Sequence, residues 1–276
     1  MYPESTSAAS VAHEAPNQSP WASPPLIKHK YWFERTFNTG LAHTIVGIVG
    51  NVISFGLFLS PMPTFFQIYK KKAVEEFQPY PYLGTVMNCI IWIFYGLPFI
   101  TKDNILVLTI NGVGLGIEIL YLTVYFVYAN DRKKRLRVAQ IIGLEALLTV
   151  GIVLLAIFVF HSRRTLMVGI IADVFNIIMY LSPLAIARKV IKTRSVEYMP
   201  FWLSLAAFSN GICWTIYGLL QFDIFILVSN GLGSISGFLQ LCLYAYFYFN
   251  GDHKTKDQVK KPSAEVQLSN LPIGAA

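Results

Sequence analysis

The chain has 276 residues, of which 54% are hydrophobic and only 13% are charged. These proportions exclude an ordinary soluble globular domain and indicate an integral membrane protein. The net charge of +7 does not indicate a nucleic-acid partner, because the basic residues gather at the ends of the apolar segments.

The first 40 residues are polar and rich in serine and proline, which predicts a disordered extracellular tail at 1–40. Within this tail, Asn17 begins an Asn-Gln-Ser triplet, the acceptor pattern for N-glycosylation. At the other end, residues 251–276 are charged and predict a disordered cytosolic tail.

Seven apolar blocks lie between the tails, each close to the ~20 residues that a helix needs to cross a bilayer. The predicted spans are 41–61, 81–100, 105–129, 138–160, 166–187, 200–220 and 224–249. Twelve lysines and arginines fall in the loops after the first, third and fifth spans, against three in the loops on the other side. Basic loops remain in the cytosol, so the N-terminus is predicted outside and the C-terminus inside.

The second half of the chain repeats the first. The segment "FLSPMPTFFQIYKKKAVEEF" (58–77) matches "YLSPLAIARKVIKTRSVEYM" (180–199), and "CIIWIFYGL" (89–97) matches "GICWTIYGL" (211–219). The repeat relates Pro61 to Pro183, Trp92 to Trp214, and Asn111 to Asn230, at offsets of 122, 122 and 119 residues. Each copy holds three spans and one span is left between them, so both copies face the membrane in the same direction.

The predicted fold is an all-α membrane protein with seven transmembrane helices, arranged as two parallel three-helix bundles (3+1+3) joined by a linker helix. The first three-helix repeat is expected over 41–130, the linker helix over 131–163, and the second repeat over 164–250.

Short motifs in both repeats resemble the SWEET family of sugar facilitators. The motifs "AHTIVGIVGN", "YGLPF", "KDN", "TINGVG", "LSPL", "KTRSVEYMPF", "WTIYGL" and "SNGLG" follow the order and spacing of that family over residues 41–249. The segment "KKKAVEEFQPYPYL" is more similar to the plant members associated with hexoses than to those associated with sucrose.

This resemblance implies passive, bidirectional transport of a monosaccharide such as glucose by alternating access, with no cofactor. It implies the plasma membrane, with the vacuolar membrane as the alternative, and it allows assembly into homo- or hetero-oligomers. Transport of sucrose instead of a monosaccharide remains an alternative.

Two polar pairs in the spans are candidate sugar ligands. Asn111 and Asn230 lie at a common depth, ~10 Å from the outer edge, where amides are costly unless they find partners. The resemblance places both in the sugar site, although each amide could instead bond a neighbouring helix. Trp214, at the same depth, and its repeat partner Trp92 are expected to stack on the sugar ring, the alternative being helix packing.

Asn88 and Asn210 stand four residues before these tryptophans and therefore share their helix faces. The resemblance implies that these positions set the volume of the pocket. Asparagine there favours a monosaccharide, because disaccharide carriers of the family tend to have serine.

Two groups of residues are candidate gates. Four prolines lie at the predicted cytosolic edge, in two repeat-related pairs, and are interpreted as hinges of an inner gate: Pro61, Pro81, Pro183 and Pro200. At the outer edge, Tyr95 or Lys102 could contact Asp223 and close the pathway reversibly, and the resemblance favours Tyr95.

Three carboxyls within the spans, Glu118, Glu145 and Asp173, leave proton-coupled transport by a related PQ-loop-like bundle as an alternative. A seven-span receptor would not account for the repeat. An enzyme is not indicated either, since the five histidines have no metal-binding spacing and the glycines of "GVGLG" follow no predicted strand. These glycines are expected to permit close helix packing.

Overall fold

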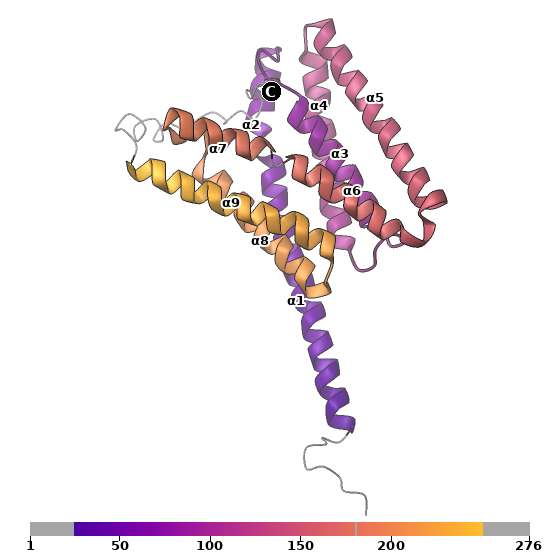
Figure 1. Ribbon diagram of the computed structural model, residues 1–276. Coiled ribbons are helices and arrows are strands. Elements are labelled where there is room, and N and C mark those ends of the chain that lie inside the picture. Colours follow the sequence, from indigo (N-terminus) through magenta and orange to yellow (C-terminus); the bar gives the residue numbers. More distant parts are fainter. Residues whose placement is uncertain (1–24, 180, 251–276) are drawn as a thin grey trace, which may run out of the picture. The chain divides into compact units, whose positions relative to one another are not determined.

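The computed structural model describes residues 25–179 and 181–250, and the chain divides into two compact units, Met1–Gly40 and Leu41–Ala276 (Figure 1). The described part of the first unit is helical, because helix α1 spans Pro25–Leu59. The helix therefore begins within the predicted tail 1–40, at Pro25. A proline suits the first turn of a helix, and neither proline nor glycine occurs from Leu26 to Thr39.

The described part of the second unit consists of helices and contains no strand. The α-helices that follow α1 are α2 (Met62–Lys71), α3 (Tyr80–Tyr95), α4 (Ile105–Tyr128), α5 (Arg132–Leu154), α6 (Arg164–Met179), α7 (Leu181–Thr193), α8 (Phe201–Gln221) and α9 (Ile224–Asn250). A π-helical turn at Leu155–Val159 extends α5, and 3-10 turns occupy His161–Arg163 and Val196–Tyr198.

Six helical segments of the described chain are long and apolar enough to cross a membrane, one fewer than predicted. The missing one is the second predicted span, 81–100, because α3 has only 16 residues and ends at Tyr95. Gly96 and Pro98 follow directly, and a proline disfavours helical backbone at the residue before it. The chain continues in turns to Asn104, so the remaining residues of this span are not helical.

The first predicted span does not end at Pro61. Helix α1 stops at Leu59, Pro61 is the N-cap of α2, and the helical path then resumes to Lys71. In the second repeat, Pro183 likewise lies in the first turn of α7, which runs on to Thr193. A proline is tolerated in a first turn because the amide hydrogen that it lacks would have no partner there.

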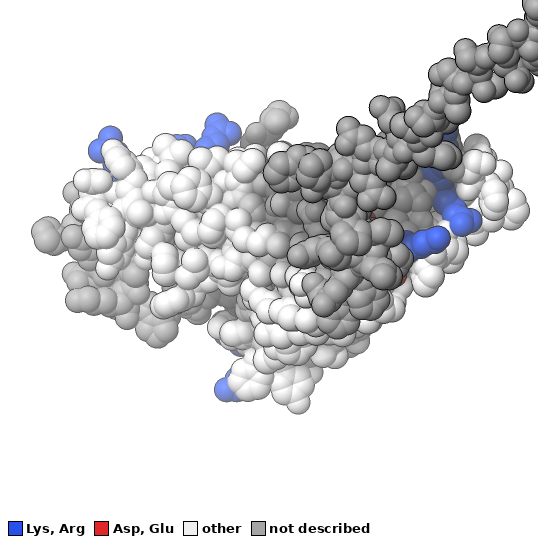
Figure 2. Space-filling model, turned by 90° about the horizontal axis from the view of Figure 1, so that it is seen from below, with Lys and Arg blue, Asp and Glu red and all other residues white. Residues whose placement is uncertain are grey.

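Large apolar side chains face outward on the second unit, as a lipid-exposed surface requires. Phe158, for example, is 76% exposed and Leu147 is 69% exposed. In Figure 2, the lysines and arginines in view lie at the edges of a broad uncharged surface. Large apolar side chains are therefore exposed over much of this surface. In water, such a surface would promote aggregation.

The third helix of each repeat contacts the other two. Helix α4 packs against α2 and α3, whereas α9 packs against α6, α7 and α8 (Figure 1). Between the repeats, α3 contacts α6, and Ser54 of α1 is hydrogen-bonded to Asn210 of α8. The repeat offset relates α1 to α6 and α3 to α8, so these two junctions are equivalent. Helix α5 lies beside α3, which completes the 3+1+3 arrangement.

Close helix contact occurs at Gly114 alone among the three glycines of "GVGLG". A methyl group built on Gly114 would come within 2.3 Å of the Phe58 ring on α1, whereas Gly112 and Gly116 face open space. The prediction that these glycines permit close packing is therefore confirmed only for Gly114.

Candidate functional site

A cavity of about 360 Å³ lies between the two repeats. Its wall includes Asn111 and Trp92 from the first repeat and Trp214 and Asn230 from the second, and it extends to Pro61 and Pro81. We call the end of the bundle with these two prolines the proline end, and the opposite end, with Asp223, the Asp223 end. The volume lies in the ordinary range for small-molecule sites, roughly 300–1,000 Å³.

Asn111 and Asn230 are held in the same way on the cavity wall. The side-chain nitrogen of Asn111 donates to the carbonyl oxygen of Val107 over 2.8 Å, and that of Asn230 donates to the carbonyl of Ile226 over 2.9 Å. The partner of each amide is thus its own helix, four residues earlier, and not a neighbouring helix. Each amide keeps an oxygen and a second N–H with which it can bind a ligand.

Trp214 is fixed by a short hydrogen-bonded chain that crosses between the repeats. Its indole N–H donates to Ser54 Oγ over 3.1 Å, and Ser54 Oγ donates to Asn210 Oδ1 over 2.6 Å. The indole is only 6% exposed and packs over Gly50 and edge-on to Tyr217. The indole N–H is already bonded to Ser54. Trp214 can therefore contact a ligand with the face of its ring but cannot donate a hydrogen bond to it.

Asn88 and Trp92 line the cavity from α3. Trp92 packs edge-on against Tyr95, with ring centroids 5.4 Å apart, and is 5% exposed. The buried side-chain oxygen of Asn88 has no hydrogen-bond partner within the described part of the chain. Asn210, its repeat equivalent, has its oxygen occupied by Ser54. The two repeats therefore present different polar groups at matching positions.

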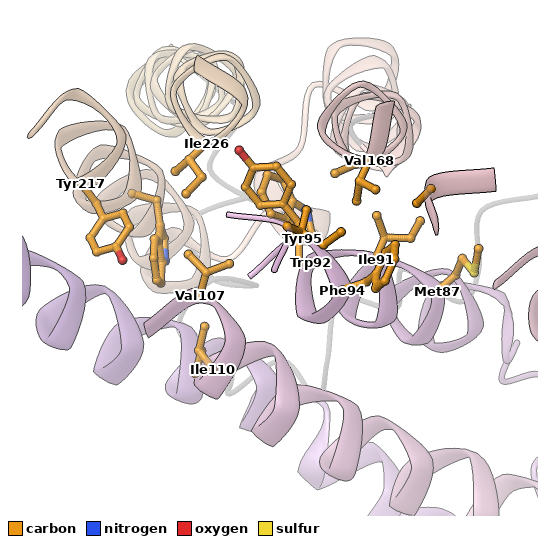
Figure 3. Packing of buried hydrophobic residues seen from close by; sticks show 14 residues of the cluster. Met87, Ile91, Trp92, Phe94, Tyr95, Val107, Ile110, Val168, Tyr217 and Ile226 are labelled. Atoms are coloured by element: carbon orange, nitrogen blue, oxygen red, sulfur yellow. The ribbon is translucent and has the colours of Figure 1, made fainter. Parts of the chain in front are cut away.

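The repeats are joined at the Asp223 end through one carboxylate. Tyr95 Oη donates to Asp223 Oδ1 over 2.8 Å, and Asn104 Nδ2 donates to Asp223 Oδ2 over 2.8 Å. The backbone N–H groups of Phe225 and Ile226 also donate to Oδ1, each over 3.2 Å. Figure 3 shows Trp92 and Tyr95 of α3 beside Ile226 of α9, with Tyr217 of α8 and Val107 of α4 around the same space.

The structure brings Tyr95 to Asp223 but not Lys102, which is exposed and makes no ion pair among the described residues. Asn104 occupies the place that Lys102 was expected to take. A second contact supports this end of the bundle, since Tyr217 Oη donates to the carbonyl of Asp103 over 3.3 Å and His43 stacks on the Tyr217 ring.

The four prolines differ in their position relative to the cavity. Pro61 and Pro81 line the cavity, whereas Pro183 and Pro200 are not among its lining residues. Pro200 is the N-cap of α8, and Pro81 lies in the first turn of α3. Asn17 lies outside the described residues. No cluster of His, Cys, Asp or Glu suited to a metal ion occurs in the described part of the chain.

Comparison with known proteins identifies the family. A family model described as "Sugar efflux transporter for intercellular exchange" matches residues 44–133 and 166–252, one match for each repeat. The chain belongs to the SWEET family. It is 48% identical over 235 residues to the bidirectional sugar transporter SWEET5 of Arabidopsis thaliana, covering 84% of this chain and 95% of the relative. SWEET4 of the same plant is 49% identical over 240 residues, again with 84% and 95% covered.

The structure of a eukaryotic SWEET transporter has the same fold. It matches with a TM-score of 0.74 at 38% identity, covering 77% of this chain and 99% of that structure. The chain is therefore a multi-pass SWEET protein that transports sugar, and it is not an enzyme.

Four polar residues of this SWEET protein escaped prediction from the sequence. Ser54, Asn176 and Glu118 line the cavity, and Asn104 binds Asp223. The repeat could have indicated three of them, because an offset of 122 relates Ser54 to Asn176 and an offset of 119 relates Asn104 to Asp223. The sequence indicates Glu118 as a carboxyl within a span and as one candidate for proton coupling, but it does not indicate that Glu118 faces the cavity.

Proposed function

We propose that the chain transports a monosaccharide such as glucose, passively and in both directions, by alternating access. The observation that carries this proposal is the cavity between the repeats. It has polar side chains and two indole rings on its wall, extends to the proline end, and is separated from the Asp223 end by hydrogen bonds between the repeats. A two-sided carrier needs a central site that faces one side at a time.

The sugar would lie at the level of Asn111 and Asn230. Each amide keeps polar groups for the hydroxyls of a sugar, and each hydrogen bond contributes about 0.5–1.5 kcal/mol net. The faces of Trp92 and Trp214 would stack on the apolar face of the ring. Asn88 and Asn210 reduce the space beside the two indoles, which favours one sugar ring over two.

Alternation would exchange the contacts at the two ends. Breaking the bonds of Tyr95 and Asn104 with Asp223 would open the Asp223 end. At the proline end, the helix break at Pro61 and the first-turn prolines Pro81, Pro183 and Pro200 would let the helices bend as that end closes. The four prolines thus act as hinges of the inner gate.

The orientation follows from the basic loops. Lysines and arginines gather beside the proline end, in the segments 70–72, 132–137 and 188–194, so this end is cytosolic and the Asp223 end is extracellular. The N-terminus then lies outside and the C-terminus inside, in the plasma membrane. Assembly of several copies is expected from the family resemblance.

The test is flux in liposomes that contain the purified protein. Labelled glucose, fructose and sucrose are measured for uptake and efflux, with and without a pH gradient. Glucose that equilibrates in both directions without regard to pH is the expected result. Accumulation of glucose against its gradient when protons flow inward would refute passive transport, and a preference for sucrose would refute the assignment to monosaccharides.

The central site is tested with two single variants. Asn111→Ala and Asn230→Ala should each abolish glucose flux, while the amount of protein in the membrane and its elution from a sizing column stay unchanged. Wild-type flux in either variant would refute the placement of the sugar between the two amides.

A further inference from the structure

Glu118 is a carboxyl on the wall of the cavity. It stands seven residues after Asn111 on α4, so it lies on the same helix face, ~10 Å closer to the proline end. The side chain is only 3% exposed and lines the cavity, and its Oε2 atom has no hydrogen-bond partner within the described part of the chain. A buried acceptor without a partner requires an explanation.

No hydroxyl of the described residues binds the Oε2 atom of this carboxyl. Thr85, on the neighbouring helix α3, donates its hydroxyl to the carbonyl of Pro81. Tyr121, one turn further along α4, donates to the carbonyl of Phe58. Each of these hydroxyls donates to a backbone oxygen, and the Oε2 atom of Glu118 can still accept a hydrogen bond from whatever enters the cavity.

The fold itself does not need an acid at this place. The repeat equivalent of Glu118, at the offset of Asn111 and Asn230, is Gly237. A methyl group built on Gly237 would come within 3.0 Å of the backbone of Phe208, so even a small side chain would be crowded there. The same three-helix unit thus folds without a carboxyl, and Glu118 is a feature of the first repeat alone.

A carboxyl group suits the ligand that this cavity is proposed to carry. Its two oxygens can accept hydrogen bonds from two neighbouring hydroxyls of a sugar. In a membrane interior, an ionisable side chain is costly and is retained mainly where it lines a pathway or binds a ligand.

We propose that Glu118 is a second sugar-binding residue, which accepts hydrogen bonds from the hydroxyls as the sugar moves between the asparagine level and the proline end. This proposal rests on the proposed function of the cavity. It requires a hydrogen-bond acceptor at Glu118 and no movement of a proton, so glutamine should largely replace glutamate.

The test compares two variants of Glu118 with matched variants of Glu145. Glu145 is also buried with an unpartnered Oε2 atom, but it lies on α5 and does not line the cavity. Glucose KM and maximal rate are measured in liposomes for each direction of flux. Glu118→Leu should raise KM for glucose entering from the proline end roughly tenfold, because leucine accepts no hydrogen bond from the sugar hydroxyls. Glu118→Gln should change it less than about threefold.

The Glu145→Leu and Glu145→Gln variants should keep wild-type kinetics. Three results would overturn the proposal: unchanged kinetics in Glu118→Leu, equal loss in Glu118→Gln and Glu118→Leu, or the same loss in Glu145→Leu. The second of these would show that the charge or proton of Glu118 matters. Absence of glucose flux in the wild type, or full flux in Asn111→Ala, would instead refute the proposed function on which this proposal rests.

A second measurement does not depend on the folding of the leucine variant. Infrared difference spectra of the wild-type protein should show a carboxyl band that shifts when glucose is added. The shift should disappear in Glu118→Gln and persist in Glu145→Gln. A spectrum without a glucose-dependent carboxyl band, or a band that Glu118→Gln leaves unchanged, would overturn the proposal.

Discussion

Replacing Tyr95 by phenylalanine removes one hydroxyl from the hydrogen bonds that join the two repeats at Asp223. The Tyr95 Oη to Asp223 Oδ1 distance is 2.8 Å, and Tyr95 is only 1% exposed, so water does not take the place of the phenol in the closed state. Asp223 keeps Asn104 and two backbone N–H groups as donors. Only one charge-assisted bond is lost, and the ring that packs against Trp92 remains.

A hydrogen bond to a charged group contributes about 1.5–3 kcal/mol. Its loss should favour the state that is open at the Asp223 end by roughly 10- to 150-fold. Spin labels at positions 102 and 222, which are both exposed and belong to different repeats, report this opening by double electron–electron resonance. The exposed Cys242 and the half-buried Cys213 are first replaced by serine, so that the labels attach only at the chosen positions.

The matched control is Tyr217→Phe, the repeat equivalent of Tyr95. Tyr217 donates to a neutral backbone carbonyl over 3.3 Å, so its removal should cost less, about 0.5–1.5 kcal/mol. The longer-distance population should therefore grow strongly in Tyr95→Phe and weakly in Tyr217→Phe. An unchanged distance distribution in Tyr95→Phe, or an equal change in both variants, would refute the reasoning that the Asp223 carboxylate closes this end.

Three further predictions concern the cavity and the packing of the helices. The double variant Asn88→Ser/Asn210→Ser should gain sucrose flux in liposomes, because the smaller side chains enlarge the cavity. An unchanged sucrose flux would show that other residues limit the size of the transported sugar. Ser54→Ala leaves the Trp214 N–H without its acceptor, at a cost of about 1–3 kcal/mol to the folded protein. Because the indole is then no longer fixed, glucose binding measured by tryptophan fluorescence should weaken, by roughly 150-fold at most; unchanged affinity would show that the Trp214 orientation does not matter. Gly114→Ala should lower the stability measured by melting in detergent by about 1–3 kcal/mol, because the added methyl group meets the Phe58 ring. Gly112→Ala on the same helix should leave the stability unchanged, because Gly112 faces open space. Equal melting temperatures of the two variants would contradict this packing.

Much of the architecture could be predicted because membrane helices carry strong local signals. Block length and the internal repeat predicted the all-α fold and its 3+1+3 order, and the family motifs predicted sugar transport. The limits of single helices were less predictable. Helix α3 ends at Tyr95 although the apolar sequence continues to Ile100, since Gly96 and Pro98 break the helix within an apolar run.

The sequence by itself determined which residues are equivalent in the two repeats, because repeat offsets are visible along the chain. Only the tertiary structure decided which of them meet. Tyr95 and Asn104 reach Asp223, whereas Lys102 does not, and Ser54 holds Trp214 although 160 positions separate them. Such contacts depend on how α1 and α3 pack against the second repeat. The geometry of that packing is set by side chains on several helices at once, so no single stretch of sequence encodes it.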